Sequence, residues 1–172
     1  LDHTFKGELA SCLVNPRAGH ETTLVIRATT AKKRFAVVGA GPAGLAAATT
    51  LAERGHEVDL YDAASEIGGQ FNLARRIPGK EEFSETLRYF SRRIERMGVR
   101  LHLGQRVSGP SLLAARHNAV LLATGVTPRD PKIPGQDQPG VMSYIDAILG
   151  RHAVGKRVAL IGAGGIGFDV AE

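Results

Sequence analysis

Apolar and polar positions follow two different periods along this chain, and together they predict strands that alternate with helices. Short segments dominated by Val, Leu, Ile and Ala are typical of strands in a parallel sheet that is covered on both faces. Such segments lie at residues 34–38, 57–61, 99–103, 119–123 and 156–161. The alternation of these strands with helices predicts an α/β fold.

The strongest helical pattern follows the turn at Pro78-Gly79. Its apolar positions are spaced by four, three, four and three residues, which places them on one face of a helix with a period of 3.6 residues. These positions are Phe83, Leu87, Phe90, Ile94 and Met97. Gly98 follows as a natural C-terminal stop. We interpret this stripe as core packing and not as a binding surface.

A glycine motif at the end of the first predicted strand indicates nucleotide binding. Gly39-x-Gly41-x-x-Gly44 leads into an alanine-rich helix that has Pro42 in its first turn and Gly55 at its end. The first glycine permits a tight turn, the second lets the backbone approach a pyrophosphate, and the third lets helix and strand pack closely. The helix N-terminus offers free N–H groups and a positive dipole end to the same pyrophosphate.

An acidic residue completes the motif. Asp62 ends the second strand, about twenty residues after the glycines, where its carboxylate can accept the hydroxyls of an adenosine ribose. Strand, glycines, helix, second strand and acid occur in order, which is the context that the motif requires. The alternative is a glycine-rich turn between strand and helix that binds no ligand.

Further candidate residues lie near strand ends, where open α/β sheets bind their ligands. Gly68-Gly69-Gln70 combines two glycines that permit close approach with an amide that both donates and accepts. Thr124-Gly125 ends the fourth strand. Lys80 precedes the striped helix and is placed to reach a phosphate or a flavin edge. The alternatives are a plain surface loop for the first segment and an ordinary surface lysine for Lys80.

The glycine pattern recurs near the C-terminus. The predicted buried strand 156–161 runs into a second turn and helix whose glycines are Gly162, Gly164, Gly165 and Gly167. Before it come a linker at 130–140, with three prolines and two glycines, and a short helix at 143–149 with a capping-box-like start. We therefore divide the chain into an extended connecting segment (1–32), a first nucleotide-binding domain (33–138) and the beginning of a second (139–172).

Composition narrows the function classes. The hydrophobic fraction is 43% and the charged fraction is 23%, as in soluble globular proteins, and no apolar run approaches the roughly 18 residues that span a membrane. The net charge of +5 is spread over separate arginines, and the chain has no Trp. Both observations favour a solvated surface over a nucleic-acid-binding face.

The single cysteine excludes an internal disulfide framework and suits a reducing compartment. We expect a cytoplasmic protein with no nucleic-acid or membrane partner and, because the start lacks a Met or a signal-peptide core, a piece of a longer chain.

Two dinucleotide motifs with Thr124-Gly125 between them resemble the two-dinucleotide flavoprotein reductases. Four segments narrow the resemblance to the C-terminal half of the bacterial NADPH-dependent 2,4-dienoyl-CoA reductases and their relatives, trimethylamine dehydrogenase and other fused old-yellow-enzyme proteins. They are SCLVNPRA (11–18), SEIGGQFN (65–72), IPGKEEF (77–83) and GGIGFD (164–169). The resemblance implies a Rossmann-like FAD-binding fold of the two-dinucleotide type, followed by the start of a second, NAD(P)-binding Rossmann fold.

The resemblance also implies an electron relay. A hydride passes from NADPH or NADH to FAD, and electrons then cross a [4Fe–4S] cluster to FMN in an upstream barrel of the same polypeptide, where a 2,4-dienoyl-CoA or similar enoyl substrate is reduced. Cys12, which by itself is most simply a small buried hydrophobic residue, would be one of four cluster thiolates. The other three thiolates, the barrel and its catalytic residues would precede this sequence. We assign no catalytic residue here and expect the piece alone to be inactive.

The cofactor positions are carried over in the same way. For FAD they are Gly39, Gly41, Ala43, Gly44, Asp62, Gln70, Lys80, Val107, Thr124 and Gly125, and for the nicotinamide nucleotide they are Gly162, Gly164, Gly165 and Gly167. Two other hypotheses stay open. Trimethylamine dehydrogenase-like relatives hold only ADP in the first site, so that the domain is structural, and a third hypothesis is an electron-input subunit of the glutamate-synthase type. The intact second motif favours the redox role.

Overall fold

Four parallel strands form the centre of the molecule. The computed structural model describes residues 2–10, 12, 15 and 17–172, and its strands are β1 (Arg34–Val38), β2 (Glu57–Tyr61), β3 (Arg100–His102) and β4 (Ala119–Leu122). They lie in the order β3-β2-β1-β4, and every neighbouring pair is parallel. After β3 the chain returns across the sheet to place β4 on the other side of β1. The carboxyl ends of β1 and β4 therefore border the crevice in which such sheets bind ligands.

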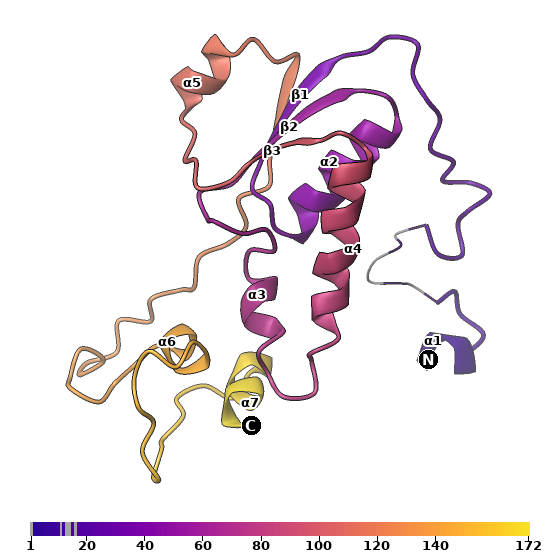
Figure 1. The fold of residues 1–172 in the computed structure, drawn as a ribbon. Coiled ribbons are helices and arrows are strands. Elements are labelled where there is room, and N and C mark those ends of the chain that lie inside the picture. The colour runs from indigo at the N-terminus through magenta and orange to yellow at the C-terminus, as the bar shows by residue number, and fades with distance from the viewer. Residues whose placement is uncertain (1, 11, 13–14, 16) are drawn as a thin grey trace.

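Two helices cover one face of this sheet (Figure 1). Helix α2 (Pro42–Glu53) packs on β1 and β2, and α4 (Phe83–Arg96) packs against α2. The core between them contains Val37, Leu45, Ala48, Val58, Leu60, Leu87, Phe90 and Ile94. The predicted stripe on α4 is thereby confirmed as core packing, because its central residues are buried and Met97 packs against their edge.

The opposite face of the sheet carries a buried carboxylate. Asp59 on β2 is 2% exposed and accepts hydrogen bonds or ion pairs from Arg34 (Nε, 3.1 Å), Arg100 (Nε, 2.7 Å), His102 (Nε2, 3.1 Å) and His117 (Nε2, 2.9 Å). Burial by itself would raise the pKa of Asp59, but the hydrogen bonds from Arg100, His117 and His102 hold that pKa well below its usual value. The cluster thus joins three parallel strands and the segment before β4.

Arg34 also connects the segment between β3 and β4 to the sheet. Helix α5 (Gly109–Ala114) begins with a capping box in which Ser108 and Ser111 bond reciprocally. After it, Arg34 donates from its guanidinium to the Ala115 carbonyl at 3.3 Å, and its backbone N–H donates to the Asn118 side chain at 2.8 Å. These contacts set the position at which β4 begins beside β1.

The remaining elements are short. They are α1 (Asp2–Phe5), α3 (Phe71–Ala74), α6 (Tyr144–Ile148) and α7 (Gly165–Ala171). The predicted cap of α6 is confirmed, since the Ser143 hydroxyl accepts from the Asp146 N–H at 3.1 Å. Between α1 and β1 the described residues form turns and extended chain without a strand, as expected for a connecting segment. Where the domains begin and end stays a prediction.

The prediction of a buried strand at 156–161 is wrong. These residues form no strand, and Val158 and Ile161 are 61% and 79% exposed. An isolated apolar segment becomes a strand only when a neighbouring strand pairs with its backbone, and no strand in the described part of the chain does so. β4 is a strand as predicted, but it lies at an edge of the sheet with Leu122 75% exposed.

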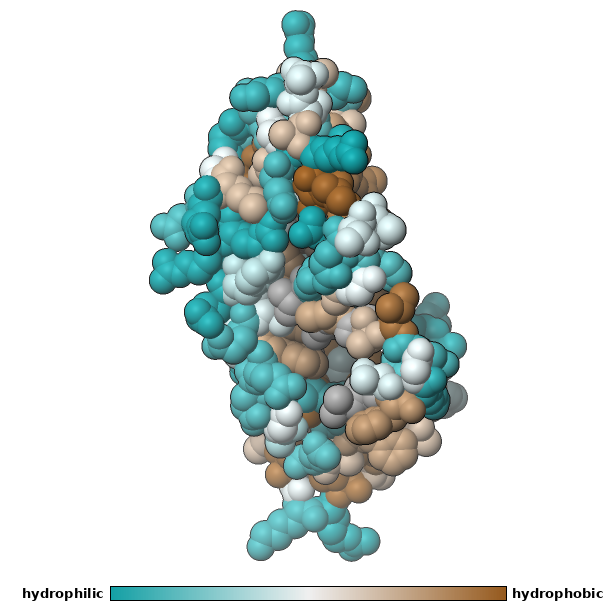
Figure 2. All heavy atoms as spheres, turned by 90° about the vertical axis from the view of Figure 1, so that its right-hand side faces the viewer, coloured by the Kyte–Doolittle hydropathy of each residue, from teal (hydrophilic) through white to brown (hydrophobic). Residues whose placement is uncertain are grey.

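The C-terminal part of the chain exposes several large apolar side chains. Figure 2 shows a mostly hydrophilic face with separate apolar patches, the broadest of them toward its lower end. Exposed apolar residues of the C-terminal part are Val154, Val158, Leu160, Ile161, Ile166 and Phe168. Among the described residues, no helix is both long and apolar enough to cross a membrane.

Candidate nucleotide-binding site

The first glycine turn connects β1 to α2, and each of its three glycines meets a different restriction. Gly39 has a left-handed φ of +107°, and a Cβ placed there would lie 2.2 Å from the Ala123 carbonyl oxygen. A Cβ on Gly44 would lie 1.7 Å from the Gly39 carbonyl oxygen, whereas one on Gly41 would meet nothing within 4 Å. Gly39 and Gly44 thus close the turn onto β4 and onto itself, and the backbone at Gly41 is open. Ala43, two residues after Gly41, is exposed in the first turn of α2.

Asp62 lies beside this turn at the carboxyl end of β2. One carboxylate oxygen accepts from the Ala40 N–H at 2.6 Å, and the other accepts from the Ala64 N–H at 2.8 Å. Ala40 stands between the first two glycines of the motif, so that Asp62 holds the turn directly. Two bonds use part of the roughly four acceptor sites of a carboxylate, which leaves capacity for ribose hydroxyls.

The segment Gly68-Gly69-Gln70 lies over the same turn. The Gly68 N–H donates to the Ala40 carbonyl at 2.8 Å, and a Cβ on Gly69 would lie 3.3 Å from the Gly41 Cα. The Gln70 amide donates to the Val126 carbonyl at 2.6 Å. The segment therefore links the glycine turn to the chain that follows β4.

Residues after β3 and β4 reach the same edge of the sheet. The Ala123 N–H donates to the Val38 carbonyl at 2.8 Å, and Thr124 and Gly125 follow in an exposed segment where Gly125 has a φ of +74°. On the other side, the Gln105 N–H donates to the Asp62 carbonyl at 2.9 Å, two residues before Val107. The structure thus brings the predicted residues near Asp62 and the first turn to one end of the sheet.

Lys80 pairs with a residue of the C-terminal part of the chain. Its ammonium lies 2.6 Å from a carboxylate oxygen of Asp169 on α7. The predicted contact of Lys80 with a cofactor stays a prediction. Asp169 was missed by the sequence reasoning, because a charge on a helix does not reveal a partner 89 positions away.

The second glycine turn repeats the local geometry of the first. Gly162 has a φ of +124°, and Gly164 precedes α7 in an extended conformation (φ −88°, ψ 175°) close to that of Gly41 (φ −73°, ψ 178°). A Cβ on Gly167 would lie 2.3 Å from the Gly162 carbonyl oxygen, whereas Gly165 is open. The turn forms here without a strand in front of it.

Cys12 is exposed, and its sulfur accepts from the Asn15 N–H at 3.4 Å. Residues 11, 13, 14 and 16 of the cysteine segment lie outside the described residues. Within the described ranges, no group of three or more His, Cys, Asp and Glu side chains could hold a metal ion. The chain has one cysteine, so a four-thiolate cluster at this position needs cysteines from elsewhere, and the metal assignment stays a prediction.

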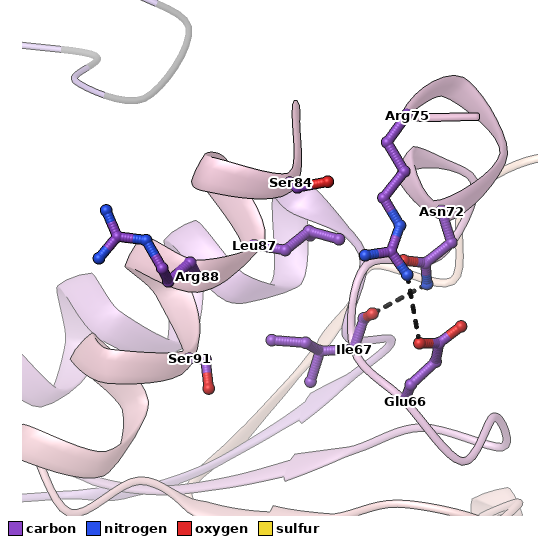
Figure 3. A pocket seen from close by; sticks show the side chains of 8 residues that line it. All are labelled: Glu66, Ile67, Asn72, Arg75, Ser84, Leu87, Arg88 and Ser91. Atoms are coloured by element: carbon purple, nitrogen blue, oxygen red, sulfur yellow. Dashed lines mark hydrogen bonds and ion pairs between the residues drawn. The ribbon is translucent and has the colours of Figure 1, made fainter. Parts of the chain in front are cut away.

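The hollow between α4 and the loop before α3 lies apart from these residues. It measures about 310 Å³, and Figure 3 shows Arg75 pointing toward Glu66 (3.5 Å) and Asn72 donating to the Ile67 carbonyl (2.9 Å) along its rim. None of the predicted site residues lines it. This hollow is therefore separate from the predicted nucleotide site.

A parallel sheet of order 3-2-1-4 with a glycine turn after its first strand, an acid after its second and a second glycine turn defines a dinucleotide-binding α/β protein. Residues 33–172 match the family described as pyridine nucleotide-disulphide oxidoreductase. The chain belongs to this family, which confirms the predicted fold class. It is a flavoprotein oxidoreductase module of the kind that binds FAD and NAD(P)H.

Individual relatives are similar over nearly the whole chain. A metal reductase of Desulforamulus reducens is 33% identical over 175 residues, which cover 99% of this chain and 26% of that protein. A solved 2-naphthoyl-CoA reductase in complex with 2-naphthoyl-CoA is 33% identical with a TM-score of 0.90, covering 98% of this chain and 26% of that one. A 6-hydroxypseudooxynicotine amine oxidase from Pseudomonas geniculata is 30% identical with a TM-score of 0.73, covering 87% and 24%. The chain thus spans about a quarter of the length of the relatives it matches.

Proposed function

We propose that this chain is the FAD-carrying electron-transfer module of an NAD(P)H-dependent cytoplasmic reductase, with FAD at the first glycine turn and NAD(P)H at the second. The observation that carries the proposal is the repeated turn geometry. In both turns the first glycine is left-handed, the second is extended, and the last packs against the carbonyl of the first. A turn kept only for structure has no need of the open backbone at Gly41 and Gly164.

The residues of the first turn fit FAD. The space at Gly41 lets a pyrophosphate approach the first N–H groups of the twelve-residue helix α2, whose dipole favours an anion. Asp62 has acceptor capacity left for ribose hydroxyls, and Gln70 and Thr124 border the same end of the sheet. When bound, FAD supplies the exchange between hydride transfer and single-electron transfer.

The rest of the relay lies outside these residues and belongs to the same proposal. Cys12 would give one thiolate to a [4Fe–4S] cluster, and an upstream segment of the polypeptide would give the other three and an FMN-binding barrel. The similarity to a 2-naphthoyl-CoA reductase supports a conjugated acyl thioester, such as a 2,4-dienoyl-CoA, as the final electron acceptor.

A second candidate follows from the resemblance to trimethylamine dehydrogenase-like proteins, in which the first site holds ADP and the domain is structural. The two are separated by purifying the full-length protein and identifying its nucleotides after denaturation. We expect a yellow protein that releases FAD and whose flavin is bleached by NAD(P)H without oxygen. A protein that releases ADP and no FAD would contradict the redox proposal and support the structural one.

A further inference from the structure

One ion pair joins the two nucleotide-binding parts of the chain. The Lys80 ammonium and the Asp169 carboxylate lie 2.6 Å apart, and both side chains are about one-third exposed (35% and 32%). Among the described residues, no other ion pair connects the range 33–138 with the range 139–172. Figure 1 shows α7 beneath α3 and beside the loop that leads to α4, in agreement with the ion pair.

The backbone at Lys80 is held by a hydrogen bond to a residue whose side chain is buried. Its backbone N–H donates to the carbonyl of Ile77 at 3.0 Å, and the Ile77 side chain is buried. On either side of this turn, the rings of Phe71 on α3 and Phe83 on α4 stack with centroids 4.6 Å apart. The turn at Lys80 is thereby tied to the helix that packs against the core.

The aspartate is coupled just as directly to the second glycine turn. Asp169 is on α7, which starts from that turn, and Gly167 two residues earlier packs against the Gly162 carbonyl while its N–H donates to the Gly164 carbonyl at 2.8 Å. The Lys80 ammonium is therefore connected to the turn assigned to NAD(P)H through the Asp169 side chain and the short helix α7.

We propose that Lys80 and Asp169 are positioning residues that hold the second glycine turn in its orientation toward the first fold. This inference rests on the proposed function. In that function NAD(P)H gives a hydride to FAD and becomes NAD(P)⁺, which requires the two reacting atoms to meet at about 3–3.5 Å. An ion pair whose two side chains are about one-third exposed contributes little to global stability, so we expect its effect on the orientation of the second glycine turn.

The test uses the full-length protein with Lys80→Gln, Asp169→Asn and the charge-swapped double variant Lys80→Asp/Asp169→Lys. Glu66→Gln is the matched control, because Glu66 pairs with Arg75 at 3.5 Å within the first fold (Figure 3). Three quantities are measured: FAD content, the limiting rate of flavin reduction at saturating NAD(P)H, and amide hydrogen exchange in residues 165–171 without nucleotide.

We expect each single variant to keep its FAD and to lower the limiting rate about 10- to 100-fold, the range that a misplacement of up to 1 Å produces. Exchange in α7 should accelerate in both single variants while exchange in α2 stays unchanged. The charge-swapped variant should recover most of the rate and of the protection, and Glu66→Gln should change neither.

Three results would overturn the inference. Loss of FAD in Lys80→Gln but not in Asp169→Asn would make Lys80 a cofactor contact. A charge-swapped variant as slow as the single variants would show that the pair itself does not matter, and unchanged exchange in α7 would show that it orients nothing. If the unaltered protein is not reduced by NAD(P)H, the proposed function fails, and the exchange measurement still decides the role of the pair.

Discussion

The carboxylate of Asp62 and the backbone N–H of Ala40 are 2.6 Å apart, so the acid at the end of β2 holds the glycine turn at the end of β1. The residue assigned to the ribose is thus also a support of the turn assigned to the pyrophosphate. In the proposed function, this side chain would therefore couple recognition of the ribose to recognition of the pyrophosphate.

Asp62→Ala should weaken FAD binding and leave the fold intact. Removal of a charged acceptor from paired hydroxyls costs about 1.5–3 kcal/mol per bond, and the turn also loses its bond to Ala40. Isothermal titration with FAD measures the change. Asp62→Asn, which keeps an acceptor oxygen for Ala40, should lose less, and an affinity unchanged in both variants would refute the ribose assignment.

Alanine at the second and third glycines of the first turn should have opposite consequences. Gly44→Ala places a methyl group 1.7 Å from the Gly39 carbonyl, so we expect a loss in the free energy of unfolding of about 1–3 kcal/mol or more from overpacking. Gly41→Ala meets no atom within 4 Å and should fold nearly normally, but its methyl group occupies the path of the pyrophosphate. Urea unfolding and FAD titration of both variants test this, and tight FAD binding by Gly41→Ala would place the cofactor elsewhere.

Cys12→Ser in the full-length protein should damage or abolish the iron–sulfur cluster, because a hydroxyl is a much poorer ligand for iron than a thiolate. Reduction of FAD by NAD(P)H should survive, since it precedes the cluster in the proposed relay, while reduction of the final substrate collapses. Iron and sulfide analysis beside stopped-flow flavin reduction separates these steps. A full complement of iron in the variant would remove Cys12 from the ligand set.

Because of Asp59, the free energy of unfolding should depend on pH in the acid range. Its pKa is lower in the folded than in the unfolded state, so its contribution is complete above the unfolded value of about 3.9 and is lost as the pH falls toward the folded value. At pH 7, Asp59→Asn should lower the free energy of unfolding by about 1–3 kcal/mol, because it leaves the half-exposed guanidinium groups of Arg34 and Arg100 without their buried anion.

Urea unfolding of the unaltered chain and of Asp59→Asn at pH 7, 4 and 3 measures this effect. The difference in free energy of unfolding between the two proteins should shrink below pH 4. A difference that is the same at all three pH values would show that the Asp59 charge contributes nothing.

Where the determinants are local, the sequence alone predicted the structure. The glycine turns follow from residues that lack a Cβ at the points of closest approach, and the second turn forms even though no strand precedes it. The stripe from Phe83 to Met97 and the cap at Ser143 depend on spacings within one helix. These features, with Asp62 at the next strand end, were sufficient to identify a dinucleotide-binding α/β protein.

Only the tertiary structure decided which distant groups meet. Asp59 reads as one polar residue in a strand, and its four cationic or imidazole partners come from three other segments of the chain. The pairing of Lys80 with Asp169 joins residues 89 positions apart, which no local pattern predicts. The apolar segment 156–161 remained exposed, because a strand exists only through the backbone of another strand, and that pairing cannot be read from the segment itself.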